Sequence, residues 1–265
     1  MKLALCFSLT TLLTLNADFK KVAVDYELEG TSFRGHLVYS EDIKKKSTLP
    51  TILMVPNWRG PDTEATMEKA MEVADDEFAV FIADMYGTEV RPTNGKEAGA
   101  AAGFVRSDRA LMRARAQKAV DVFKGLAEEH PIDADKMIGI GFCFGGGTLL
   151  EYVRSGSEDL NGVVSFHGDL VSPTLEADAS KVKTPILVLH GADDPYVPQD
   201  HVQKFIGAMQ AGDVDDWQLI QFSGAVHSFT DPTAQSDGAR YHKRTAERAF
   251  EIMEDFAEEV LDIED

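Results

Sequence analysis

Three residues whose side chains can together activate a nucleophile follow one another along the chain: Cys143, then Asp194, then His227. A cysteine attacks as its thiolate, and a histidine within hydrogen-bond reach can take the thiol proton. A carboxylate on the other side of the imidazole fixes the tautomer and stabilises the charged ring. Nucleophile, acid and histidine is also the chain order of one class of triads built on α/β sheets. The sequence therefore predicts a catalytic triad in which Cys143 is the nucleophile, His227 the base and Asp194 the acid.

The nucleophile assignment depends on the segment around Cys143. An apolar run rich in Ile leads into Gly141-Phe-Cys-Phe-Gly145, and a pattern typical of a helix follows directly. This is a strand–elbow–helix pattern, which raises a nucleophile above a parallel sheet. Gly141 and Gly145 flank a residue in a strained conformation, where a Cβ would collide with the adjoining strand or helix. A cysteine among glycines can also be simple packing, so the acid and the histidine decide the interpretation.

Other residues compete for the acid and base roles. For each of the three residues alone a structural role is the simpler interpretation: packing, a turn, or a helix cap. Asp193 adjoins Asp194, and the pattern His190-Gly-x-x-Asp-x-x-Val-Pro198 selects Asp194 as the acid. His190 and His167 directly precede a glycine at a predicted strand end, which is a common packing position. The combination, in the right order and contexts, favours catalysis.

Acyl transfer also needs hydrogen-bond donors for the developing oxyanion. The backbone N–H of Phe144 stands at the start of the predicted elbow helix, where the helix dipole favours negative charge. Trp58, in the loop after the first central strand, is the best candidate for the second donor. Further side chains near the strand ends are candidates for a substrate pocket: Asn57, Arg59, Tyr86, Arg91 and Phe229.

Strands and helices must alternate to bring these residues together. Residues 21–28 and 33–39 alternate apolar with polar side chains and predict an antiparallel hairpin. The remaining strands are expected at residues 51–56, 78–84, 136–142, 162–168, 184–191 and 217–222. Helices are expected directly after the elbow and at residues 63–76, 107–129, 199–210 and 245–261, with Ser107 as the cap of the helix over 107–129. Continuously apolar strands are typical of parallel sheets buried on both faces. We therefore expect one α/β domain over residues 18–265, a doubly wound and mostly parallel sheet with its chemistry at the carboxyl ends of the strands.

The charge balance limits the class of partner. The chain has 265 residues and a formal net charge of −19, which disfavours nucleic acid and anionic membrane surfaces. A small-molecule substrate fits this composition, with no metal or organic cofactor and with a monomer or small homo-oligomer as the assembly.

The first residues resemble a targeting segment. Met1-Lys2 precedes an apolar stretch over residues 3–15 that is too short to span a bilayer comfortably, and small Ala17 follows. Residues 1–17 therefore predict a signal peptide cleaved after Ala17 and export to the periplasm or the medium, with no membrane span in the mature chain. The alternative is a buried N-terminal element in a cytoplasmic protein. Cleavage would remove Cys6, so Cys143 would be the only cysteine and no intramolecular disulfide could form.

From Thr51 to the C-terminus the chain resembles the dienelactone hydrolase family, a cysteine-nucleophile branch of the α/β-hydrolases. The motifs that carry the resemblance are those at residues 83–87, 141–147, 190–198 and 224–229. The resemblance implies hydrolysis of an ester or lactone through a thioester acyl-enzyme. In it Cys143 attacks, His227 moves protons, Asp194 orients His227, and Trp58 and Phe144 supply backbone donors.

The chain also departs from the family pattern. Well-studied members carry a glutamate, which helps to activate the thiol, where this chain has Asn57. They hold the carboxylate of dienelactone with two arginines, and the matching positions here are Thr88 and Asp231. Arg59 or Arg91 are the candidates to compensate. Dienelactone itself is thus not the expected substrate, and a non-catalytic ligand-binding protein or a transacylase are the alternatives to a hydrolase.

Overall fold

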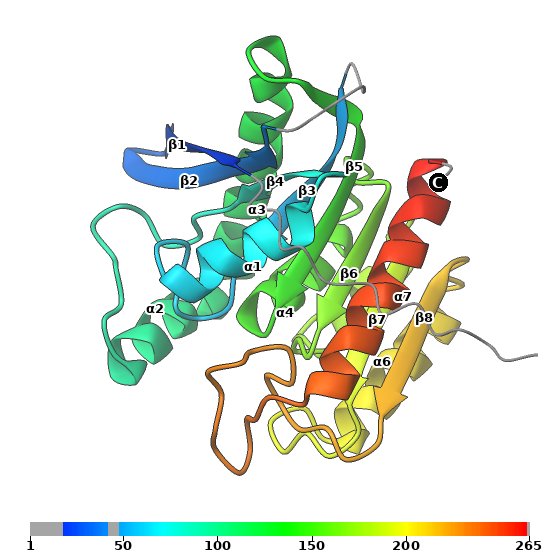
Figure 1. Ribbon diagram of the computed structural model, residues 1–265. Helices are drawn as coiled ribbons and strands as arrows, with labels where there is room; N and C mark the ends of the chain where they lie inside the picture. Colours follow the sequence, from blue (N-terminus) through cyan, green and yellow to red (C-terminus); the bar gives the residue numbers. More distant parts are fainter. Residues whose placement is uncertain (1–17, 42–47, 264–265) are drawn as a thin grey trace, which may run out of the picture.

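A computed structural model describes residues 18–41 and 48–263 and contains an eight-stranded sheet (Figure 1). The predicted signal peptide lies outside the described residues. In the sheet the strand order is β1-β2-β4-β3-β5-β6-β7-β8. The strands are β1 (Phe19–Leu28), β2 (Thr31–Ser40), β3 (Leu49–Val55), β4 (Ala79–Ile82), β5 (Ile132–Phe142), β6 (Gly162–Phe166), β7 (Ile186–Gly191) and β8 (Trp217–Phe222).

The sheet is parallel from β4 to β8, and β2 alone runs antiparallel to both strands beside it, β1 and β4. β1 and β2 pair along their whole length, from Phe19 opposite Ser40 to Leu28 opposite Thr31. The predicted α/β architecture is confirmed: a doubly wound, mostly parallel sheet with an antiparallel N-terminal hairpin.

Helices cover both faces of this sheet, because successive residues of each buried strand point to opposite sides. On β3, Leu53 and Val55 join the core beneath one set of helices, and Ile52 and Met54 join the other. The first set is α2 (Gly95–Ser107), α3 (Arg109–Gly125), α4 (Phe144–Val153), α5 (Leu175–Ala179) and α6 (Gln199–Ala211). The second set is α1 (Glu64–Ala74) and α7 (Lys243–Leu261), which lie in front of the sheet in Figure 1.

Three helices differ from the sequence prediction. Helices α2 and α5 were not expected, and the long helix predicted from Ser107 begins at Arg109. Ser107 ends α2, and Asp108 is the N-cap of α3, because its side chain accepts a hydrogen bond of 3.0 Å from the N–H of Leu111. The helix also ends early, at Gly125, and a single 3-10 turn over Leu126–Glu128 follows.

The strand order fixes where the functional loops meet. After β3 the chain moves to β4 on one side and later to β5 on the other, so β3 and β5 form the topological switch point. Val55 lies beside Gly141 in this pair, which brings the loop after β3 next to the elbow after β5. The loops after β6, β7 and β8 open along the same edge. Within the described parts of the chain no helix is long and apolar enough to cross a membrane.

Candidate active site

Cys143 stands at the tip of a strained turn between β5 and α4. Its φ of 55° lies in the left-handed region that residues with a Cβ rarely adopt. A Cβ at Gly145 would collide with the carbonyl oxygen of Val55, and one at Gly141 would collide with the backbone of Gly145. The glycines therefore let the first turn of α4 lie directly on the ends of β3 and β5, and Cys143 remains half-buried at the edge of the sheet.

The structure brings Cys143, His227 and Asp194 into one hydrogen-bonded chain. His227 Nε2 lies 3.0 Å from Cys143 Sγ, and His227 Nδ1 lies 2.7 Å from Asp194 Oδ2. Asp193 is exposed, and its N–H donates to the carbonyl of Ala225. Asp194, not its neighbour, therefore contacts the histidine.

The carboxylate of Asp194 is buried and held from two sides. Its Oδ1 accepts hydrogen bonds from the backbone N–H groups of Tyr196 at 2.8 Å and Val197 at 3.2 Å, which leaves Oδ2 for His227. Burial raises the pKa of Asp194, but the hydrogen bond and charge of His227 and these two N–H groups outweigh it, so the pKa is lowered. Asp194 is consequently ionised at neutral pH.

The imidazole of His227 is strongly basic in this setting. Burial lowers its pKa, but the hydrogen bonds and charges of Asp194 and Cys143 outweigh burial and raise the pKa to about 10. His227 is therefore protonated at neutral pH, with an N–H directed at the carboxylate and another at the sulfur. Two further rings pack edge-to-face on it, His167 with centroids 5.0 Å apart and Tyr196 at 5.3 Å.

Tyr86 contacts both predicted oxyanion residues, Phe144 and Trp58. Phe144 is the first residue of α4, and its N–H belongs to the first helical turn, which lacks intrahelical partners. Tyr86 packs on the Phe144 ring with centroids 5.6 Å apart, and its hydroxyl donates to the carbonyl of Trp58 at 2.9 Å. The Trp58 side chain is 39% exposed and packs over Gly95 and Gly99 of α2. Tyr86 thus connects the loop after β3 with the elbow.

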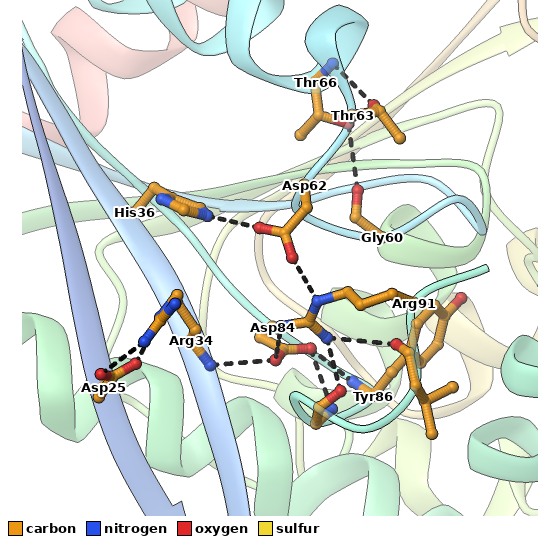
Figure 2. A network of polar contacts seen from close by, with 12 residues as sticks. Asp25, Arg34, His36, Gly60, Asp62, Thr63, Thr66, Asp84, Tyr86 and Arg91 are labelled. Atoms are coloured by element: carbon orange, nitrogen blue, oxygen red, sulfur yellow. Dashed lines mark hydrogen bonds and ion pairs between the residues drawn. The ribbon is translucent and has the colours of Figure 1, made fainter. Parts of the chain in front are cut away.

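A buried carboxylate holds Tyr86 in this position (Figure 2). Asp84, at the end of β4, accepts hydrogen bonds at Oδ1 from the N–H groups of Tyr86 at 2.9 Å and Gly87 at 3.1 Å. Its Oδ2 pairs with Arg91 at 2.9 Å, and Arg91 also pairs with Asp62 in the loop after β3. The guanidinium of Arg91 therefore links two loops of the site through carboxylates.

The other predicted pocket residues have varied surroundings. The Asn57 side chain accepts a hydrogen bond of 2.9 Å from the N–H of Arg59, within its own turn. The guanidinium of Arg59 is exposed and lies over the Trp58 ring, 5.8 Å from its centroid. Phe229 is fully buried in the core and packs edge-to-face on His167 at 5.2 Å.

One charged side chain beside Phe144 was not named in the sequence prediction. Arg106, in the last turn of α2, is half-buried, and its guanidinium carbon lies 5.8 Å from the centroid of the Phe144 ring. It has no carboxylate partner among residues 18–41 and 48–263. Nothing in the sequence indicated it, because the Gly- and Ala-rich segment of α2 gives little apolar periodicity.

No group of three or more His, Cys, Asp or Glu residues that could hold a metal ion occurs in the described part of the chain. The polar groups of the site instead satisfy one another through the Cys143, His227 and Asp194 contacts.

This sheet, with an elbow after β5 and a histidine after β8, defines the class of α/β-hydrolase folds. The sequence profile of the dienelactone hydrolase family matches residues 36–261, and the chain belongs to this family. The predicted resemblance is confirmed. The chain is accordingly a hydrolase of the ester or lactone type.

Solved structures and curated relatives agree with this assignment. A protein named m3DLH is 31% identical, with a TM-score of 0.80, over 91% of this chain and 98% of its own. A dienelactone hydrolase-like promiscuous phosphotriesterase from metagenomic libraries is 32% identical, with a TM-score of 0.81 over the same shares. A Saccharolobus solfataricus protein named "Putative carboxymethylenebutenolidase" is 32% identical over 47% of this chain and 45% of its own length. The matched segment thus spans about half of that curated relative.

Proposed function

We propose that the protein hydrolyses a carboxylic ester or lactone by nucleophilic catalysis at Cys143, through a thioester acyl-enzyme. The observation that carries the proposal is the continuous contact from Cys143 Sγ to His227 Nε2 at 3.0 Å and from His227 Nδ1 to Asp194 Oδ2 at 2.7 Å. Each member follows a different strand of one sheet, and family membership supports the reaction class.

The contact between His227 and Cys143 is the basis on which we assign activation of the thiol to the histidine. The raised pKa of His227, about 10, keeps a charged imidazolium 3.0 Å from the sulfur of Cys143. Asn57 takes no part in the pair, because its side chain bonds to the N–H of Arg59. This arrangement accounts for a working nucleophile in a chain that has no carboxylate at the position of the family glutamate.

The reaction then follows from the geometry. The thiolate of Cys143 attacks the carbonyl carbon, and the oxyanion accepts hydrogen bonds from the N–H groups of Phe144 and Trp58. The tetrahedral intermediate collapses as the imidazolium of His227 gives its proton to the leaving alkoxide, which leaves a thioester. Neutral His227 next removes a proton from water, the hydroxide attacks the thioester, and the acid and the thiolate are released.

Two arginines indicate which esters bind best. Arg59 lies over Trp58 and Arg106 lies over Phe144, so each predicted oxyanion residue carries a guanidinium on its ring. A negative group on the substrate would gain a charge-assisted hydrogen bond from either one. Dienelactone itself stays a poor expected substrate, because Thr88 stands where the family has an arginine for its carboxylate. The favoured substrate is an ester whose anionic group lies beside α2 instead.

The proposal is tested with short-chain activated esters, neutral and carboxylate-bearing, on the wild type and on variants. Cys143→Ala and His227→Ala should each remove nearly all turnover while the far-UV circular dichroism stays unchanged. Cys143→Ser should react slowly, because a hydroxyl is far less ionised than a thiol beside the same histidine. Arg106→Gln should raise the KM for the anionic ester by about tenfold and leave that for the neutral ester unchanged.

Three results would contradict the proposal. Normal turnover by Cys143→Ala would exclude the thiol as nucleophile. Stoichiometric acylation of Cys143 without product release would identify a ligand-binding protein on the same scaffold, and transfer of the acyl group to an added alcohol in preference to water would identify a transacylase.

A further inference from the structure

The loop that carries His227 is strained, and it is held both at His227 and at Thr230. The N–H of His227 donates to the carbonyl of Gly238 at 3.2 Å, and the carbonyl of His227 accepts from the N–H of Arg240 at 3.0 Å. Ser228, directly after the histidine, has a φ of 54°, in the left-handed region. Thr230, two residues further on, is only 2% exposed, and both its carbonyl and its hydroxyl are hydrogen-bonded to other elements. The contacts of Thr230 are thus a second anchor, which limits how the segment after His227 can move.

Lys69 of α1 holds the carbonyl. Its ammonium donates a hydrogen bond of 2.8 Å to the oxygen of Thr230. The same nitrogen lies over the rings of Phe142 and Phe250, 5.3 Å and 5.0 Å from their centroids, and the side chain is only 14% exposed. Burying an amine is costly, and burial lowers the pKa of Lys69 although the nearby Glu72 opposes it. A lysine used only for solubility would not be placed here.

His167, at the end of β6, holds the hydroxyl. Its Nε2 lies 3.0 Å from Oγ1 of Thr230, and its ring packs edge-to-face on both His227 and Phe229. Its own φ is 41°, so the backbone is strained to place this ring. Burial lowers the pKa of His167 well below its usual value, with the charges of His227 and Lys69 adding to the effect. A neutral ring can lie against the charged His227 without repelling it.

A pocket that is partly open to solvent lies beside this loop. It measures about 110 Å³ and lies between Lys69, His167, Ser228 and Thr230. The pocket leaves the loop room to move if its contacts at Thr230 are lost. Movement of about 1 Å at the imidazole would be enough to break a hydrogen bond of 3.0 Å to sulfur.

We propose that Lys69 and His167 are positioning residues, which grip Thr230 from two sides and thereby hold His227 against the nucleophile Cys143. This inference rests on the proposed function, because it assigns the two residues to the geometry of the thiol–imidazole pair. Because both residues act on His227 through Thr230, their loss should slow the chemical step more than it weakens binding.

The test replaces Lys69 with Met, which keeps an apolar stem over the two rings but removes the donor. Lys69→Met should lower kcat by roughly 10- to 100-fold and change KM by less than about twofold, as expected for a misplaced catalytic group. Alkylation of Cys143 by iodoacetamide at neutral pH should slow as well, because the sulfur loses its imidazolium partner. Lys69→Arg keeps a donor and should restore most of both rates. Lys204→Met, at an exposed lysine of α6 that pairs with Asp200, is the control and should change neither.

A second pair of variants covers the case in which Lys69→Met does not fold. Thr230→Val removes the hydroxyl that contacts His167 but keeps the shape, and Thr230→Ser retains it. Slow alkylation in the valine variant and a normal rate in the serine variant would support the proposal. Wild-type kcat and alkylation rates in folded Lys69→Met and Thr230→Val would overturn it. That outcome is distinct from failure of the proposed function, which would show as turnover independent of Cys143.

Discussion

The pKa of His227 is set by the two side chains that contact its ring. Asp194 contacts Nδ1 of His227 and Cys143 contacts Nε2, and these two contacts raise the pKa of His227 to about 10. The raised pKa means that folding is favoured by protonation of this ring. That contribution is fully present below the unfolded pKa of about 6.5 and is lost as pH rises through about 10.

Removal of the Asp194 carboxylate should change the pH dependence of the reaction at Cys143. Asp194→Asn eliminates the charge that raises the pKa of His227, so the imidazolium is lost at a lower pH and the thiolate loses its stabilising partner. We expect kcat to fall by about 10³-fold. The rate of iodoacetamide alkylation of Cys143, plotted against pH, should move toward higher pH.

The neighbouring aspartate supplies the control for this experiment. Asp193→Asn changes the same charge on an exposed side chain that does not contact His227, and its profile should match the wild type. An equal shift in both variants would assign the effect to general electrostatics and would contradict the role given to Asp194.

Individual site residues could be predicted where a motif surrounds them. Cys143, Asp194 and His227 each lie in a motif, and the structure places them in contact. The roles of Arg91 and Arg106 could not be predicted, because they depend on which carboxylates the folded chain brings near them. Arg91 has Asp84 and Asp62, whereas Arg106 has none among the described residues.

Helix α4 and its approach to the sheet determine where the nucleophile stands. The fully buried Glu151 of α4 pairs with Arg113 of α3 at 2.5 Å, and Arg113 also pairs with Asp178 of α5 at 2.6 Å. These pairs fix the far end of α4, and the glycines fix its beginning. The helix that carries Phe144 is therefore held at both ends.

A methyl group at the near end should disturb the site more than the fold. In Gly145→Ala the Cβ would meet the carbonyl of Val55, so the end of β3 and the Trp58 loop must move. We expect kcat/KM to fall by at least 10²-fold, with destabilisation of about 1–3 kcal/mol in urea unfolding.

A glycine on α2 provides the matched control. A Cβ at Gly103 would have nothing within 4 Å, so Gly103→Ala should stabilise the protein by about 0.5–1 kcal/mol and leave activity unchanged. A Gly145→Ala variant with wild-type kcat/KM would show that close packing of α4 on β3 is not required.

The buried strands could be predicted from the sequence more fully than the helices. The buried strands were predicted because parallel strands in a two-sided core are continuously apolar, as β3, β6 and β7 are. Helix α2 was missed because Gly95, Gly99 and Gly103 give it low helix propensity, and its packing on Trp58 comes from tertiary structure. The cap of α3 was misplaced by one residue, since Ser107 and Asp108 are both good caps and only the fold chooses between them.

Across the whole molecule, one edge of the sheet gathers every functional loop. Chain order alone predicted the fold class and this edge, because parallel strands joined by helices must all end on the same side. It did not predict the loop contacts, such as Tyr86 to Trp58 or Lys69 to Thr230, which join residues far apart in the sequence. The chain has a net charge of −19, but within residues 18–41 and 48–263 Arg59 and Arg106 form no ion pair with a carboxylate. This contrast would favour anionic substrates at close range.

Direct detection of the acyl group on the chain tests the central claim best. A slowly hydrolysed activated ester is mixed with the wild type, the reaction is quenched with acid within the first turnover, and the peptide containing Cys143 is analysed by mass spectrometry. The account predicts that this peptide carries one acyl group as a thioester, that the label decays at the rate of turnover, and that Cys143→Ala carries none. An acyl group found on another residue, or full turnover with no label at any quench time, would contradict it.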